Sequence, residues 1–106
     1  METSKAVKLE ILLGTEDRSD QAPLVRKILE AGKEAGLSGM TVTKAVAGFG
    51  RSGALHKAAL ADLAENLPLL VETIDQEEKV VAFVKSNRKL LENLRIALID
   101  VKLAVL

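Results

Sequence analysis

The order of hydrophobic patterns along this chain restricts its fold more than any single motif does. Apolar residues alternate with period two over residues 7–13, which predicts a strand with one buried face. Apolar residues at helical spacing follow over residues 24–35, with Pro23 suited to the first turn and Gly36 to the stop. We expect Ser19 or Asp20 to cap this helix. The first third of the chain therefore predicts a strand followed by a helix.

The remaining segments continue this alternation. Residues 41–47, rich in Thr and Val, and the apolar run 69–74 predict two further strands, and the alternating tail 99–106 predicts a fourth. The Ala-rich segment 54–65 between the second and third strands predicts a short helix. Asp75 is expected to cap a second long helix, with Glu78 completing a capping box.

This order is β-α-β, a helical or looped excursion, and β-α-β again. It predicts an α+β, ferredoxin-like βαββαβ fold, in which two long helices cover one face of a four-stranded antiparallel sheet. We expect residues 1–106 to form a single domain. Leu12, Leu70 and Ile74 fall on the opposite, open face of the sheet. Apolar residues there predict that this face is covered, most simply by other copies of the chain.

Composition excludes several classes of partner and site. Fifteen basic and fifteen acidic side chains cancel, so no overall field steers the chain to nucleic acid or anionic lipid. The absence of Cys excludes disulfides and thiolate zinc sites. No apolar run approaches the roughly 20 residues of a membrane-spanning helix, and the N-terminal segment has no signal-peptide core. We therefore expect a cytoplasmic protein without membrane insertion or nucleic-acid binding.

Two short motifs resemble the PII signalling proteins. They are Gly-Met-Thr-Val-Thr at residues 39–43 and Gly-Phe-Gly-Arg at residues 48–51, and residues 69–80 are also similar to the corresponding PII segment. His56 and residues 62–68 are closer to an uncharacterised PII-like family of bacteria and archaea. The resemblance implies a homotrimer with its open sheet faces turned inward. It also implies a regulatory protein that senses a small ligand and signals to a partner protein.

The chain departs from the PII pattern in three places. The segment from Thr41 to the glycines is one residue longer, which predicts a bulge. The chain has no Tyr, so the tyrosine modification of some PII proteins is excluded. PII carries a glycine-rich phosphate loop where this chain has residues 89–95 without a glycine. The resemblance thus implies the trimeric scaffold with only part of the PII nucleotide contacts.

The resemblance places a ligand beside the glycine motif, in a cleft between subunits. Gly48 and Gly50 would let the backbone approach an anionic ligand, with an adenine nucleotide as one candidate. Arg51 would supply a bidentate contact and Ser52 a hydroxyl donor. The predicted ligand-binding residues are Gly48, Phe49, Gly50, Arg51, Ser52 and His56. The alternative is that the glycines only turn the chain and that Arg51 is solvated.

His56 is the only histidine, and it has two interpretations. It is either a polar residue that contacts a backbone group or a partner subunit, or a ligand contact near Arg51. As a general base it would belong to a nucleotide-dependent enzyme, although no nucleophile stands in a recognisable relation to it. No catalytic residue and no metal ligand is assigned. A trimer that serves interaction or structure without any ligand is the remaining alternative.

Two further patterns have competing interpretations. Gly48-x-Gly50-x-x-Gly53, with Asp75 further along, fits a dinucleotide-binding fingerprint, but the chain has too few strands for a complete doubly wound domain. A basic row near the end of the second helix is either a solvated face or a substitute for the missing phosphate loop. Its members are Lys85, Arg88, Lys89 and Arg95.

Overall fold

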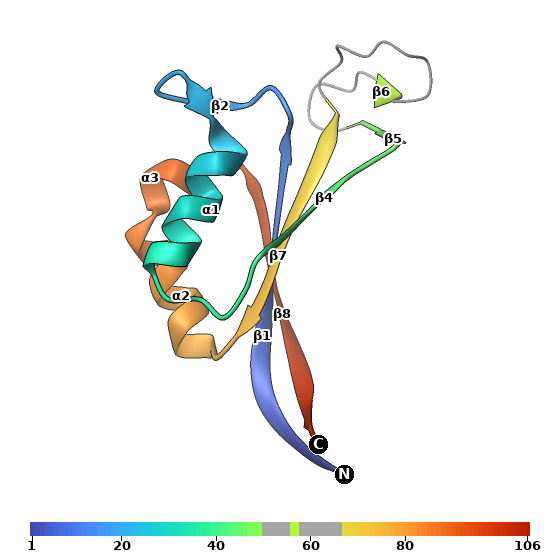
Figure 1. Ribbon diagram of the computed structural model, residues 1–106, viewed down its shortest axis with the longest axis vertical. Helices are drawn as coiled ribbons and strands as arrows, with labels where there is room; N and C mark the ends of the chain where they lie inside the picture. Colours follow the sequence, from blue (N-terminus) through green and yellow to red (C-terminus); the bar gives the residue numbers. More distant parts are fainter. Residues whose placement is uncertain (50–55, 58–66) are drawn as a thin grey trace.

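The protein is a four-stranded antiparallel sheet with its helices on one side (Figure 1). The computed structural model describes residues 1–49, 56–57 and 67–106. The strands are β1 (Glu2–Gly14), β2 (Arg18–Ser19), β3 (Ala22–Pro23), β4 (Thr41–Lys44), β5 (Ala47–Gly48), β6 (His56–Lys57), β7 (Pro68–Asp75) and β8 (Arg95–Val105). The helices are α1 (Leu24–Glu34), α2 (Glu77–Ser86) and α3 (Arg88–Leu91).

The strand order of the main sheet is β4-β7-β1-β8, and each neighbouring pair is antiparallel. The two longest strands, β1 and β8, pair along eleven positions, from Glu2 opposite Val105 to Leu12 opposite Arg95. This topology confirms the predicted α+β, ferredoxin-like fold. It also excludes the doubly wound alternative, since that fold needs a mainly parallel sheet.

The core lies between the sheet and the helix layer. Alternate side chains of β1 and β7 point into it, and α1 and α2 supply the facing apolar residues. The largest fully buried side chains are Leu9, Ile11, Ile28, Val71, Val80 and Phe83. Each contributes about 1.5–3 kcal/mol of transfer free energy, so a chain with only two Phe and no Trp or Tyr still has an adequate core.

The open face of the sheet carries apolar side chains, as predicted. Leu12 and Ile74 are 39% and 38% exposed, and Leu70 lies beside Leu12 in the β1–β7 register. The centre of this face holds charges instead. The Lys8 Nζ lies 2.7 Å from a carboxylate oxygen of Glu72 and 3.2 Å from one of Glu10. These two carboxylates raise the pKa of Lys8, with Glu72 contributing most.

The predicted start of the first helix is wrong. Ser19 and Asp20 do not cap it, because this segment is the hairpin of β2 and β3. Asp20 and Gln21 form its turn, with φ of 50° and 68°. The residue before the helix is Pro23, which has no side chain able to accept a capping hydrogen bond.

The second helix also differs from the prediction at both ends. Its N-cap is Gln76, no side-chain capping bond forms, and Asp75 precedes the cap. Helix α2 then ends at Ser86, where the Asn87 side-chain amide donates to the Phe83 carbonyl at 2.8 Å. The next turn of helix is the separate α3.

The segment predicted as one strand over residues 41–47 is interrupted. Strand β4 ends at Lys44, and the chain pairs again only as β5. The helix predicted over residues 54–65 is wrong at His56–Lys57, which form β6 opposite β5. The other residues of that prediction lie outside the described part of the chain. Among the helices of the described part, none has the length and apolarity to cross a membrane.

Candidate functional site

The predicted site begins where β5 ends. Gly48 is the last residue of β5, and its backbone pairs with that of His56 in β6, so the fold brings these two predicted residues together. Phe49 follows Gly48 and is 71% exposed. Gly50, Arg51 and Ser52 lie outside the described residues, as does Gly53 of the dinucleotide-binding fingerprint. The prediction of these site residues therefore stays a prediction.

Gly48 has a packing reason to be a glycine. A Cβ atom built on it would lie 3.0 Å from the Pro68 Cγ, closer than most real contacts of that kind. The backbone N–H of Ala45 donates to the Pro68 carbonyl at 2.9 Å, which holds the end of β4 against the start of β7. The glycine therefore lets β5 lie against the first residue of β7. Val46 (78% exposed) and Phe49 leave an apolar surface beside it.

The place of the PII phosphate loop is occupied by a short helix and a turn. Leu91 of α3 is only 2% exposed and anchors this segment in the core. Asn93 has a φ of 73°, and the Leu94 N–H donates to the Leu91 carbonyl at 3.2 Å. This compact turn leads directly into β8 at Arg95. The segment thus presents side chains, not a run of glycine N–H groups.

The basic row near this turn divides between two layers. Lys85, Arg88 and Lys89 are exposed on α2 and α3. Arg95 pairs with Leu12 in the β1–β8 register, so it belongs to the open face of the sheet. The first three residues alone remain candidates for replacing the phosphate loop.

Sequence reasoning missed a group of side chains that holds the loop between α1 and β4. The Asp75 carboxylate accepts hydrogen bonds from the backbone N–H groups of Ser38 and Gln76, both at 2.8 Å. The Thr73 hydroxyl donates to the Gly39 carbonyl, and the Lys79 ammonium donates to the Gly36 carbonyl at 3.0 Å. We call these three side chains, Asp75, Thr73 and Lys79, the loop clamp. The clamp fixes the start of the strand that leads to Gly48.

The loop clamp also explains why position 75 carries a carboxylate. This residue is 9% exposed, and each of its carboxylate oxygens already accepts a backbone hydrogen bond. Burial by itself would raise the pKa of Asp75, but the backbone hydrogen bonds from Ser38 and Gln76 outweigh it and lower that pKa. The carboxylate therefore has a structural partner on both sides and is not placed as a ribose-binding acid.

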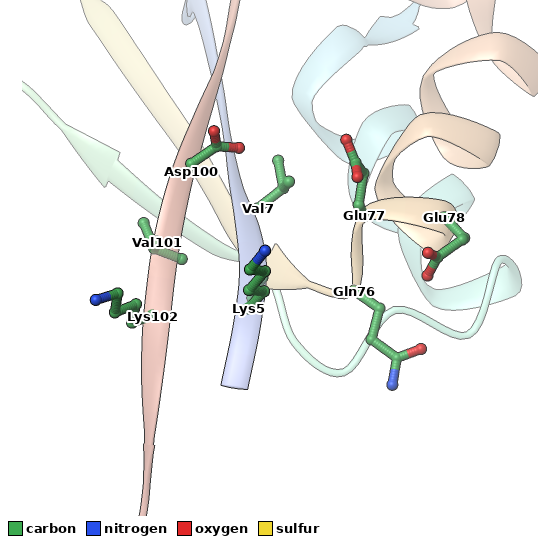
Figure 2. A pocket seen from close by; sticks show the side chains of 9 residues that line it. Lys5, Val7, Gln76, Glu77, Glu78, Asp100, Val101 and Lys102 are labelled. Atoms are coloured by element: carbon green, nitrogen blue, oxygen red, sulfur yellow. The ribbon is translucent and has the colours of Figure 1, made fainter. Parts of the chain in front are cut away.

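An open groove lies away from the glycine motif (Figure 2). It has a volume of about 720 Å³ and lies between the start of α2 and the far halves of β1 and β8. Its walls carry both signs of charge, from Lys5 and Lys102 on the strands and Glu77 at the helix. In the described part of the chain, no three His, Cys, Asp or Glu side chains gather as a metal site would require.

Comparison with known proteins identifies the family. The sequence profile of DUF190, described as "Uncharacterized ACR", matches residues 6–103. The chain belongs to the DUF190 family. A UPF0166 protein of Aquifex aeolicus is 36% identical over 85 residues, covering 80% of this chain and 81% of the relative. A UPF0166 protein of Methanocaldococcus jannaschii is 33% identical over 76 residues, covering 72% and 69%.

Solved structures of similar fold are PII-like proteins. CPII of Thiomonas intermedia, a nitrogen regulatory PII-like protein bound to ADP, AMP and bicarbonate, superposes with a TM-score of 0.71 at 17% identity. The superposition covers 98% of this chain and 100% of CPII. A putative PII-like signalling protein of Thermus thermophilus gives a TM-score of 0.70 at 18% identity, covering 98% and 94%. The likeness confirms the resemblance to PII-like proteins at the level of the fold.

Proposed function

We propose that this DUF190 protein is a trimeric, cytoplasmic, PII-like sensor of an anionic small molecule, with an adenine nucleotide as the first candidate. The observation that carries the proposal is the glycine strand end beside an exposed phenylalanine, on a fold shared with the ADP- and AMP-bound CPII. The ligand would lie in a cleft between subunits, around residues 48–52 and 56. Ligand binding would change the surface that a partner protein recognises.

Each residue of the proposed site has a distinct part. Backbone N–H groups at Gly48 and Gly50 would face the anion, and at Gly50 a side chain would keep it away. Arg51 would give a bidentate, charge-assisted contact, and Ser52 a hydroxyl donor. Phe49 offers an exposed aromatic ring to a base. His56 stands across from Gly48 in the backbone pairing and would contact the ligand or a neighbouring subunit.

The segment around α3 limits the expected affinity. Because it offers no glycine-rich turn, a phosphate would have to be held by Lys85, Arg88 or Lys89 of a helix. Exposed side-chain charges are screened by salt. We therefore expect micromolar or weaker binding that weakens further as salt rises.

Isothermal titration calorimetry with ADP, AMP and ATP at two salt concentrations tests the proposal. Arg51→Ala should weaken nucleotide binding by about 1.5–3 kcal/mol, the range for a hydrogen bond to a charged group. Gly50→Val should weaken it at least as much. Arg26→Ala, which removes an exposed arginine from α1, is the matched control and should bind as the wild type does. Absence of heat with all three nucleotides would contradict nucleotide sensing.

The exposed apolar surface at Val46 and Phe49 favours a second candidate, an interaction trimer without a ligand. In that case Phe49→Ala would abolish capture of a partner protein, and no nucleotide would bind. A nucleotide-dependent enzyme would instead show turnover that His56→Ala removes.

A further inference from the structure

Strands β1 and β8 run on together past the end of the main sheet. Strand β7 ends at Asp75, opposite Val7, so residues 2–6 of β1 pair only with residues 101–105 of β8. We call this two-stranded segment the arm, and Figure 1 shows both chain termini at its tip. A two-stranded ribbon is at best marginally stable when water surrounds it. The arm therefore needs a surface to pack against.

The two faces of the arm differ in chemistry. The register places Val101, Leu103 and Val105 on the same face as the open side of the sheet, next to Ile99. Ile99, Leu103 and Val105 are 40%, 41% and 50% exposed. On β1 the same face carries Glu2, Ser4 and Ala6, whereas the other face carries Thr3, Lys5, Lys102 and Ala104. The β8 side chains of the first face thus form an apolar row with Glu2 as the one charge beside it, and the opposite face carries two lysines.

This apolar row continues the open face of the sheet. Along β8 it leads from Ile99 toward the region of Leu12, Leu70 and Ile74, all on the same side. The Cα radius of gyration is 15.1 Å and the longest extent 46 Å, whereas a compact chain of this length has a radius of about 13 Å. The arm thus leaves the body of the molecule with its apolar row uncovered by the described residues.

We infer that the arm docks its apolar row on the open sheet face of a neighbouring copy. The inference rests on the proposed self-association and names the surfaces that make it. An arm-to-face contact joins two different surfaces, so it is heterologous, and three such contacts can close into a ring. Each copy then covers its neighbour's Leu70 and Ile74 and has its own open face covered in turn.

The charges of the open face suit a second copy better than a lipid surface. The open face carries two cations, Lys8 and Arg95, and two carboxylates, Glu10 and Glu72. Lys8 forms ion pairs with both carboxylates. The four charges of this face cancel, so the apolar row of a neighbouring arm meets no net charge there. Lys5 and Lys102, which would attract anionic lipid, lie on the opposite face of the arm and line the groove of Figure 2. A lipid-binding arm would carry them on its apolar side.

A pair of charge variants tests which face of the arm docks. Leu103→Glu places a carboxylate in the apolar row, and Ala104→Glu places the same group one residue later on the other face. Leu103→Glu should raise the concentration at which the oligomer dissociates by about tenfold or more, measured by analytical ultracentrifugation, because a buried carboxylate is costly. Ala104→Glu should leave it unchanged. Circular dichroism confirms that both variants fold.

Cysteine cross-linking locates the docked arm independently, since the chain has no native Cys. Chains carrying Leu103→Cys and Leu70→Cys are co-expressed and oxidised. A disulfide-linked pair of the two variants is expected, and replacing Leu103→Cys by Ala104→Cys should abolish it.

Two results would overturn the inference while leaving the proposed function intact. One is a trimer whose mass Leu103→Glu does not change and that gives no such disulfide. The other is a disulfide between two Leu103→Cys chains, which would mean that arms meet arms. A monomeric wild type that binds anionic vesicles through Leu103 would overturn both the inference and the proposed trimer.

Discussion

A single carboxylate connects the helix layer to the strand that leads to the candidate site. Asp75 accepts the Ser38 and Gln76 backbone N–H groups, while Thr73 and Lys79 hold the carbonyls on either side of Ser38. The loop after α1 would otherwise leave these groups to water. Because Asp75 is a buried carboxylate with two backbone donors, whereas the Lys79 ammonium is exposed, Asp75 should contribute most to the clamp.

Asp75→Asn tests the clamp through its pH dependence. The folded-state pKa of Asp75 is lowered, so its contribution to stability is fully present above the ordinary Asp pKa of about 3.9 and is lost as pH falls through the folded value. We expect Asp75→Asn to lower the free energy of unfolding by about 1–2 kcal/mol at pH 7. The difference in the free energy of unfolding between wild type and variant should become smaller below about pH 4.

Urea unfolding at several pH values measures this difference. Asp100→Asn, at an exposed position of β8, is the matched control and should shift stability little. If the difference in unfolding free energy between wild type and Asp75→Asn stays constant from pH 7 down to pH 3, the carboxylate charge does not hold the loop.

Asp75 also shows where sequence reasoning fails at the residue scale. An acid before a helical pattern, with Glu three residues later, predicts a capping box. The actual partner is Ser38, 37 residues away, and only the pairing of distant segments brings it into reach. Gly48 was predicted to contact a ligand, which stays a prediction, and the neighbour that the structure gives it, Pro68, is likewise distant in sequence.

Among the elements, α3 departs most from the PII pattern. It is a single short helix of four residues, and its one fully buried side chain is Leu91. Its burial follows from the sequence, because Leu91 continues the helical spacing of the apolar residues Val80, Phe83 and Val84. The break at Asn87 was missed, because an asparagine inside a helical pattern is only weakly unfavourable.

Leu91→Ala tests whether α3 is fixed by the core. Removing a buried leucine side chain should lower the free energy of unfolding by about 2–4 kcal/mol, from lost burial and a residual cavity. Lys89→Ala, exposed on the same helix, should change it by less than about 0.5 kcal/mol. Chemical denaturation of both variants provides the comparison. A small effect of Leu91→Ala would indicate that this segment adapts as a ligand-binding loop does.

Long strands were easier to predict than short ones, for a physical reason. The period-two patterns of β1 and β7 follow from one face being buried, and the bounds predicted for β7, residues 69–74, nearly match the observed Pro68–Asp75. Strand β1 begins five residues earlier than predicted, at Glu2, and β8 begins four residues earlier, at Arg95. The hairpin of β2 and β3 has only two residues in each strand, and its turn uses Asp20 and Gln21 at positive φ. The usual signal for such a turn is Asn-Gly or Asp-Gly, which this chain lacks there.

At the scale of the whole molecule, the open face is the surface that the proposed assembly covers. Its apolar side chains surround Lys8, which is paired with both Glu10 and Glu72, so a second surface can cover this face without leaving the ammonium unpaired. The sequence alone predicted both this face and the need to cover it, because period two fixes which side chains lie opposite the core. It did not predict the arm, since the length of β8 relative to β7 depends on where each pairing ends.

Replacing Leu70 by Glu tests directly whether other copies of the chain cover the open face. Leu70 lies between Leu12 and Thr43 in the sheet, and neither of these two neighbours carries a charge. Leu12 is less suitable, since Arg95 on the neighbouring strand would pair with a new carboxylate. Leu70→Glu should shift the light-scattering mass from about three chains of 11.4 kDa toward one, because the buried face would receive an unpaired charge.

Glu72→Gln is the control for this change, two residues along the same strand and face. It removes one partner of Lys8 but keeps the shape of the side chain, and Glu10 still holds the ammonium. The variant should therefore keep the trimer mass while making assembly less dependent on salt. A wild type that stays at 11.4 kDa at micromolar concentration, or a Leu70→Glu variant that stays trimeric, would show that the open face is not the assembly surface.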